Sequence, residues 1–358
     1  MAQIDDLLRL AQKRGASDLH LSPNAVPMAR LNGEVVPLTN ERIPRDALQL
    51  MLFEIADPVS QARFEQAKQV GFAYELQGVV RVRCSVYEQS RGIAGALRLL
   101  PEGIPSLEEL GLPRIVGDLV TRPCGLVAVC GPAGSGRSST LAALVDHVNR
   151  TLCCHIVTFE DPIEFRHACR SALVDQREIG RHTPGLAQGV RAALHEDADV
   201  VVAAEPHDLE TMEVVLNAAS GRLVLLTLTA SSAAHAVEAL LDFFPPERRP
   251  RAATMLAESL AGVLRQRLLP RADRPGRVLA LELLLGTPAV ATLIRELRTA
   301  QLDTLLRNSA GEGMCCMDDA VLSLEREGVV AAGAEARRQS APGPDGVGAG
   351  DENLSAAA

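Results

Sequence analysis

The sequence predicts an α/β protein with two folded units, a small α+β unit followed by a larger unit that contains a mainly parallel sheet. The chain has 358 residues, more than most single domains contain. Hydrophobic residues make up 47% of it but aromatic residues only 3%, which favours an aliphatic core of the kind found in parallel sheets covered by helices. From Gly125 onward, apolar strand-like runs alternate with helical stretches, which is the pattern of a parallel sheet.

The first unit is expected in residues 1–100. Apolar residues recur at helical spacing over Ile4–Lys13, which predicts a helix. Short strand-like stretches follow, separated by the Gly, Pro and Asn residues that turns require. The expected strands are residues 18–21, 28–31, 33–38, 71–76 and 79–86. Residues 101–115 contain three prolines and two glycines and are expected to form a linker.

The second unit is expected in residues 116–340, with helix continuing to about Glu327. Its expected strands are residues 125–130, 155–159, 199–204, 222–228 and 278–284, and its expected helices are residues 138–149, 186–195, 209–219 and 232–241. Residues 341–358 are rich in Ala, Gly, Pro and Asp and contain neither aromatic nor basic residues. This composition predicts a disordered tail.

Charge and composition narrow the function classes. The net charge is −9 and aromatic residues for base stacking are scarce, which disfavours a nucleic-acid motor and predicts no nucleic-acid partner. Residues 1–6 lack the basic and apolar regions of a signal peptide. The longest apolar runs, such as Leu223–Leu228, are too short to span a membrane. We therefore expect a cytoplasmic chain whose contact with a membrane is peripheral.

The strongest motif is a phosphate loop between an apolar strand and a helix. It matches the pattern G-x-x-x-x-G-K-[ST] except at Arg137, which replaces the lysine. Glycines let such a loop turn its backbone N–H groups toward phosphate, and Ser138 would supply a hydroxyl ligand to Mg²⁺. The alternative is a glycine-rich turn that binds no ligand. The expected nucleotide-binding residues are Gly131, Pro132, Ala133, Gly134, Ser135, Gly136, Arg137, Ser138 and Ser139.

Arg137 affects the expected activity. A lysine ammonium is compact and fits between the β- and γ-phosphates, whereas a guanidinium is a planar fork that needs more room. We therefore expect nucleotide binding to survive or weaken, and hydrolysis to suffer more, because catalysis depends on tight geometry in the transition state.

Carboxylates follow two of the expected strands. Glu160, Asp161 and Glu164 come just after one strand, and Glu205 ends the apolar run 199–204 in the manner of a Walker B strand. Open parallel sheets place their sites at these strand ends, where a carboxylate can orient a water molecule or hold Mg²⁺. A solvated acidic loop is the alternative interpretation for the first group.

In four motifs, the sequence resembles the type IV pilus retraction ATPases, the PilT family of the type II/IV secretion ATPase superfamily. The motifs are Gly15–Leu21, Gly131–Ser138, Glu160–Phe165 and Gly286–Ala289, and the resemblance runs in collinear order to about Glu327. It implies a PAS-like N-terminal domain and a RecA-like P-loop ATPase domain, assembled as a hexamer that drives twitching motility. It also implies ATP and Mg²⁺ as cofactors and a place at the cytoplasmic pilus base, peripheral to the inner membrane. The implied partners are an inner-membrane platform protein of the pilus and, in a mixed ring, an intact paralogous ATPase.

The resemblance also assigns roles to residues. Glu164 is the first choice for the residue that orients the attacking water, with Glu160 second, and Glu205 would act near the metal and the γ-phosphate. Family arginines that reach a neighbour's nucleotide have possible counterparts among the arginines of the first unit, whose alternative role is that of ordinary surface or strand-edge residues. These candidates are Arg81, Arg83, Arg91 and Arg98.

Several departures from the family pattern fall near the nucleotide site. Arg137 replaces lysine, Arg222 and Thr229 replace two histidines, and Ala204 replaces a glycine before Glu205. The pattern predicts a paralogue with a degenerate nucleotide site. Two functions stay open: a retraction motor whose ATP hydrolysis is weakened, or a non-catalytic regulatory subunit of a mixed ring.

Overall fold

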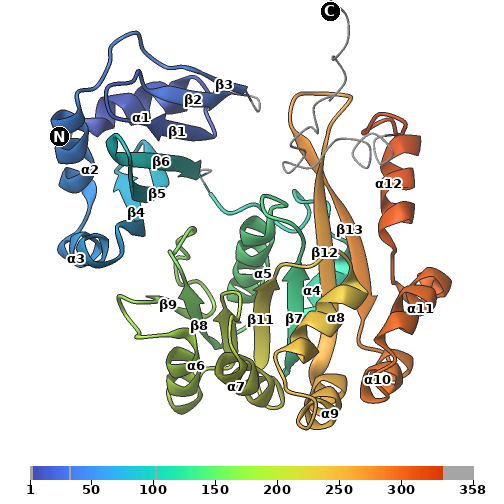
Figure 1. The fold of residues 1–358 in the computed structure, drawn as a ribbon. Helices are drawn as coiled ribbons and strands as arrows, with labels where there is room; N and C mark the ends of the chain where they lie inside the picture. Colours follow the sequence, from blue (N-terminus) through green and yellow to red (C-terminus); the bar gives the residue numbers. More distant parts are fainter. Residues whose placement is uncertain (1–2, 32–33, 101–102, 334–358) are drawn as a thin grey trace, which may run out of the picture.

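The chain folds around two separate sheets. The computed structural model describes residues 3–31, 34–100 and 103–333, so the expected tail at 341–358 lies outside the described residues. One sheet has six strands and the other has seven, and helices accompany both, as the predicted α/β class requires. In Figure 1 the first sheet and its helices are blue to teal, and the second sheet is green to orange.

The six-stranded sheet is antiparallel, with the order β3-β2-β1-β6-β5-β4. Helices α1, α2 and α3 pack against it, and Leu8, Leu52 and Phe72 are among the buried residues of its hydrophobic cluster. Its elements are α1 (Ile4–Lys13), β1 (Asp18–Leu21), β2 (Met28–Leu31), β3 (Glu34–Pro37), α2 (Arg45–Ile55), α3 (Pro58–Ala67), β4 (Gln69–Leu76), β5 (Val80–Gln89) and β6 (Gly92–Leu100).

The seven-stranded sheet has the order β13-β12-β7-β11-β10-β8-β9 and is parallel except for the edge strand β13. Its strands are β7 (Gly125–Cys130), β8 (His155–Glu160), β9 (Leu173–Glu178), β10 (Val200–Ala203), β11 (Leu223–Leu228), β12 (Leu260–Pro270) and β13 (Arg277–Leu285). Its helices are α4 (Arg114–Leu119), α5 (Arg137–Thr151), α6 (Leu186–His195), α7 (Leu209–Ala219), α8 (Ala233–Asp242), α9 (Arg249–Ser259), α10 (Pro288–Arg295), α11 (Leu302–Asn308) and α12 (Met317–Arg326), with short 3-10 turns at Thr299–Gln301 and Ala310–Glu312.

Both faces of the second sheet are covered. All six residues of β7 and all four of β10 are buried, although successive side chains of a strand point to opposite faces. The expected linker takes part in this core, because Leu107 and Leu112 are buried in the same hydrophobic cluster as β7. Among the described residues, none of the helices combines the length and the apolar character that a membrane crossing requires.

The predicted elements agree with the structure where the pattern was strongest. Observed bounds equal the expected ones for α1, β1, β2, β7, α6 and α7. The elements that the sequence did not predict are α2, α3, β6, α4, β9, β12 and α9. In β6 the pattern is weakened by Gly95, where a Cβ atom would lie 2.8 Å from a methyl carbon of Leu52 on α2. The close packing of α2 therefore excludes a larger side chain at a position where strands usually carry one.

Candidate nucleotide-binding site

The phosphate loop connects β7 to α5 and depends on its glycines. Gly131, Gly134 and Gly136 have φ angles of 150°, 75° and 91°, a region that other residues rarely adopt. A Cβ atom at Gly131 would lie 2.5 Å from the carbonyl oxygen of Gln266 and 2.7 Å from Oγ of Ser135. Glycine is therefore required there both for conformation and for space.

A buried amide supports the loop from β12. Gln266 is fully buried, and its Nε2 donates a hydrogen bond of 2.8 Å to the carbonyl oxygen of Ser135. Ser135 is also buried. This bond ties the loop to the sheet through a buried polar contact.

The amino end of α5 is suited to an anion. Its N-cap residue is Gly136 in the left-handed conformation, and no side chain of the described residues caps the first turn. The N–H groups at a helix amino end lack partners within the helix and carry a partial positive charge. Backbone groups of this kind bind phosphate, so the residues present fit the phosphates of a nucleotide.

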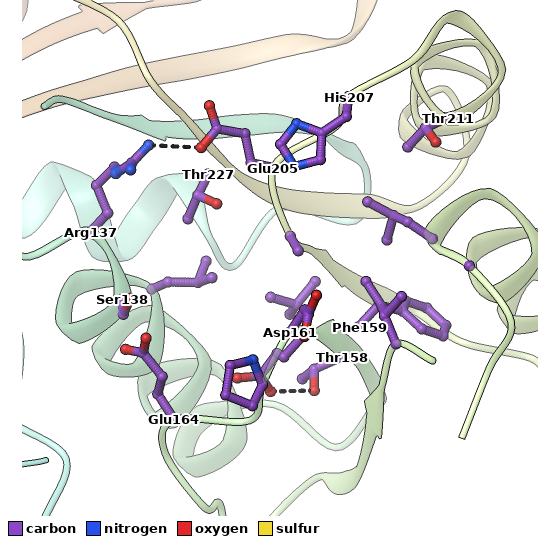
Figure 2. A pocket seen from close by; sticks show the side chains of 18 of the residues that line it. Arg137, Ser138, Thr158, Phe159, Asp161, Glu164, Glu205, His207, Thr211 and Thr227 are labelled. Carbon is purple, nitrogen blue, oxygen red and sulfur yellow. Dashed lines mark hydrogen bonds and ion pairs between the residues drawn. The ribbon is translucent and has the colours of Figure 1, made fainter. Parts of the chain in front are cut away.

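A cavity of about 610 Å³ opens beside the loop at the carboxyl ends of the parallel strands. It brings together the three predicted carboxylates, two residues at the end of the phosphate loop and one candidate arginine. The predicted site residues that line it are Arg83, Arg137, Ser138, Glu160, Glu164 and Glu205. Figure 2 shows side chains from several strand ends and from α5 converging around it. This convergence agrees with the rule that open α/β sheets bind ligands at the carboxyl ends of their strands.

Arg137 is paired with protein groups in this structure. Its Nη1 lies 3.1 Å from Oε2 of Glu205 and donates a 2.9 Å hydrogen bond to Oγ1 of Thr229 (Figure 2 shows the first contact). Thr229 in turn donates to Glu205 through its backbone N–H at 2.7 Å and through its hydroxyl at 3.1 Å. Arg137 comes from the amino end of α5, and Glu205 and Thr229 follow β10 and β11, so these contacts join α5 to the carboxyl ends of two neighbouring strands.

Glu160 lies at the end of β8 in a desolvated position. Its Oε1 accepts hydrogen bonds from Oγ1 of Thr158 at 2.7 Å and from Nε2 of Gln176 at 3.0 Å. Burial nevertheless dominates and raises the pKa of the Glu160 carboxyl above its ordinary value. A carboxyl with a raised pKa can exchange a proton nearer to neutral pH, which suits an acid–base role.

Glu164 is held by the first domain. Its Oε1 forms a 3.0 Å ion pair with Nη1 of Arg83, and its carbonyl oxygen accepts a 3.1 Å hydrogen bond from Nη1 of Arg81. Arg98 lies elsewhere and pairs with Asp18 at 3.0 Å, while Arg91 is exposed at the turn after β5. The structure thus brings two of the four candidate arginines to the carboxylate loop of the same chain and leaves two away from it.

Comparison with known proteins shows to which family this chain belongs. The family model described as type II/IV secretion system protein matches residues 1–316, most of the chain. The chain belongs to this family. It is similar to the type IV pilus retraction ATPase PilT of Pseudomonas aeruginosa, with 38% identity over 328 residues that cover 91% of this chain and 95% of PilT.

Other family members show the same similarity. The uncharacterized protein YggR of Escherichia coli is 41% identical over 315 residues, which cover 87% of this chain and 94% of YggR. The crystal structure of the pilus retraction motor PilT with bound ADP superposes with a TM-score of 0.84 at 36% identity, covering 96% of this chain and 98% of that one. The predicted resemblance to PilT is confirmed, and with it the division into an N-terminal domain and a RecA-like ATPase domain.

Several residues of the site were not predicted from the sequence. Gln176 and Gln266 support Glu160 and the phosphate loop, but both lie on strands that were not predicted. His207 lines the cavity two positions after Glu205. Its place two residues beyond a Walker B-like carboxylate was the available signal. Other lining residues that were not singled out are Thr158, Phe159, His167, Thr211 and Thr227.

Proposed function

We propose that this chain is an ATP-binding motor subunit of the PilT type that acts in type IV pilus retraction and twitching motility. The main support is the arrangement of the site: a glycine-framed phosphate loop opens onto a cavity that is also lined by Glu160, Glu164 and Glu205. The similarity to PilT extends over nearly the whole chain, so it includes the N-terminal domain as well as the loop. The chain acts in the cytoplasm, peripheral to the inner membrane at the pilus base.

Each site residue has a role in this proposal. The phosphate loop, residues 131–139, binds the phosphates through the backbone N–H groups that all of its residues except Pro132 carry. Ser138 and Glu205 would hold Mg²⁺, which neutralises phosphate charge when it is bound. Glu164 orients the attacking water, and Glu160 assists as a carboxyl of raised pKa. The products are ADP and phosphate.

The assembly is a hexamer in which neighbouring subunits complete each site. Arg81, Arg83, Arg91 and Arg98 are the candidates for groups that reach a neighbour's nucleotide. The domains assigned to this subunit are residues 1–100 and 116–340, joined by 101–115. Its partners are an inner-membrane platform protein and further ATPase subunits. Light scattering with nucleotide present tests the assembly, and a monomer at micromolar concentration would contradict it.

Arg137 weakens hydrolysis in this proposal. The guanidinium is engaged by Glu205 and Thr229, and its planar fork needs more room than an ammonium at the position between phosphates. We expect Arg137→Lys to raise magnesium-dependent phosphate release at least about tenfold, a barrier change of about 1.4 kcal/mol. The matched control is Arg150→Lys, an exposed arginine at the other end of α5. Equal turnover of the Arg137→Lys protein and the unchanged protein would contradict the role given to Arg137.

A second function is favoured by the same ion pair. If Glu205 stays engaged by Arg137, the subunit would bind nucleotide without hydrolysing it and would act as a regulatory member of a ring with an intact paralogue. Phosphate release by an intact homologue, measured alone and after mixing with this chain, separates the two functions. A change in the homologue's turnover, together with no turnover by this chain alone, supports the regulatory subunit.

A further inference from the structure

Arg137 occupies the position of the phosphate loop whose positive side chain contacts the phosphates of a bound nucleotide. In such sites the positive residue of the loop reaches the β- and γ-phosphates, and the Walker B carboxylate acts on the metal beside them. Here both residues come from these positions in the sequence, and their charged groups are 3.1 Å apart. The space between the loop and the Walker B strand is thus bridged by a protein ion pair.

This ion pair is sheltered and doubly anchored. The Arg137 and Glu205 side chains are 19% and 26% exposed, so solvent screens their attraction less than it would on an open surface. Thr229 contacts both partners, since its hydroxyl accepts from Arg137 and donates to Glu205. Its backbone N–H adds a third bond to Glu205. To release Arg137, a ligand must therefore replace its two charge-assisted hydrogen bonds, to Glu205 and to Thr229, while Thr229 continues to hold Glu205 in place.

The binding of a third phosphate conflicts with this arrangement. An ionised carboxylate only accepts hydrogen bonds, so Glu205 repels an added phosphate unless a cation lies between them. While Arg137 is paired with Glu205, neither the guanidinium nor a Mg²⁺ ion held by Glu205 is available to offset the charge of that phosphate. The first two phosphates have another source of binding, because the loop N–H groups and the uncapped amino end of α5 do not depend on the Arg137 side chain.

We propose that the Arg137–Glu205–Thr229 cluster is a specificity device that makes this site favour nucleoside diphosphates over triphosphates. The inference rests on the proposed nucleotide-binding function and adds which nucleotide the site retains. A triphosphate binds only when the ion pair opens, and a diphosphate binds while it stays closed. The site therefore holds ADP as its resting ligand.

The test compares the affinities of two nucleotides rather than turnover. Isothermal titration of the full chain with ADP and with the β,γ-imido analogue of ATP, each with Mg²⁺, gives the ratio of the two dissociation constants. We expect ADP to bind at least about tenfold more tightly, equivalent to 1.4 kcal/mol. In Glu205→Gln the carboxylate charge is removed and Arg137 is free to pair with the third phosphate, so the ratio should approach one.

A matched control removes the same charge without touching the cluster. Glu210 lines the same cavity and pairs with Arg191, so Glu210→Gln should leave the ratio unchanged. Thr229→Val, which removes the shared hydroxyl, should give an intermediate ratio. A ratio within about twofold in the unchanged protein, or the same ratio in Glu205→Gln, would overturn the inference.

The outcome also separates this inference from the proposed motor function. Equal affinities in a protein that hydrolyses ATP would leave the motor function standing and refute the diphosphate preference. A preference for ADP in a protein that does not hydrolyse ATP, even with the Arg137→Lys substitution, would support the diphosphate preference and contradict the motor function. A chain that binds neither nucleotide would contradict both.

Discussion

Arg83 on β5 and Glu164 in the segment after β8 form an ion pair between the two domains, with 3.0 Å between Nη1 and Oε1. Arg81 reinforces it through its bond to the Glu164 carbonyl oxygen. Two further ion pairs join the same domains: Arg166–Glu75 at 2.7 Å and Arg181–Asp57 at 3.9 Å. The N-terminal domain therefore holds a carboxylate segment of the candidate site through charged groups.

Reversing one charge of this contact should loosen the segment. Arg83 is 43% exposed, so the pair itself contributes about 0.2–1 kcal/mol, but Arg83→Glu places two like charges together. We expect faster amide hydrogen exchange over residues 161–167, measured by mass spectrometry, and recovery in the swapped double variant Arg83→Glu with Glu164→Arg. Arg91→Glu changes the same charge at an exposed position and should leave this exchange rate unaltered. Unchanged exchange in Arg83→Glu would show that the pair does not hold the segment.

The amide of Gln266 should set the rigidity of the phosphate loop. Gln266→Leu leaves the buried carbonyl oxygen of Ser135 without its donor, at a cost of about 1–3 kcal/mol. We expect ADP affinity to fall about tenfold in calorimetric titration, because part of this cost appears as ordering of the loop on binding. Gln301→Leu, at an exposed position far along the chain, is the matched control. An ADP affinity equal to that of the control would contradict the supporting role.

The raised pKa of Glu160 predicts a pH-dependent stability. Because the folded protein keeps this proton to higher pH than the unfolded chain, stability falls as pH rises from the ordinary pKa of 4.5 through the raised pKa. Glu160→Gln removes this titration. The unfolding temperature of the unchanged protein, measured from about pH 4 to about pH 8, should therefore fall relative to that of the variant by ~2–4 °C for each kcal/mol lost.

The control for this titration is Glu258→Gln, which changes an exposed carboxyl on α9. The difference in unfolding temperature between this variant and the unchanged protein should vary less with pH, since the Glu258 side chain is exposed to solvent in the folded chain. A difference between Glu160→Gln and the unchanged protein that stays constant across this range would rule out the desolvated state of Glu160.

A second buried carboxylate should matter for stability alone. Glu282 on β13 accepts a 2.7 Å bond from the backbone N–H of Ala233 and a 3.2 Å bond from that of Met317, so it caps the amino ends of α8 and α12. Glu282→Gln presents an N–H group to one of these donors and removes a buried charge beside Arg265. We expect a loss of about 3 kcal/mol, or roughly 6–12 °C in unfolding temperature. Glu247 is exposed, so Glu247→Gln should change the unfolding temperature little. An equally small change in unfolding temperature for Glu282→Gln would refute the capping role.

The sequence predicted the frame of the second domain well, for a physical reason. A strand buried on both faces, such as β7, needs an uninterrupted apolar run, and such a run is visible without its neighbours. By contrast, β12 carries Arg265, Gln266 and Arg267 in its middle, because it passes beneath the phosphate loop and beside Glu282. These polar residues contact the site and interrupt the apolar run, so the sequence pattern does not predict this strand.

The sequence predicted which residues belong to the site, but it did not predict which of them contact one another. The loop and the carboxylates Glu160, Glu164 and Glu205 follow from motifs and from their places after strands, and the three carboxylates line one cavity with Arg137 and Ser138 of the loop. The contacts of Arg137 with Glu205 and of Arg83 with Glu164 join residues 68 and 81 positions apart. A single sequence holds no signal for such contacts, because they depend on how the strands are ordered in the sheet and on how the two domains meet.

The hydrophobic cluster of the first sheet and that of the second are separate in the described part of the chain. Each domain is thus a cooperative unit of its own, and the bridges between them are ion pairs whose groups water can solvate when they part. Rotation of one unit on the other exposes little aliphatic core. The contacts that must break and re-form in such a rotation are thus solvated charges, while the packing inside each domain stays intact.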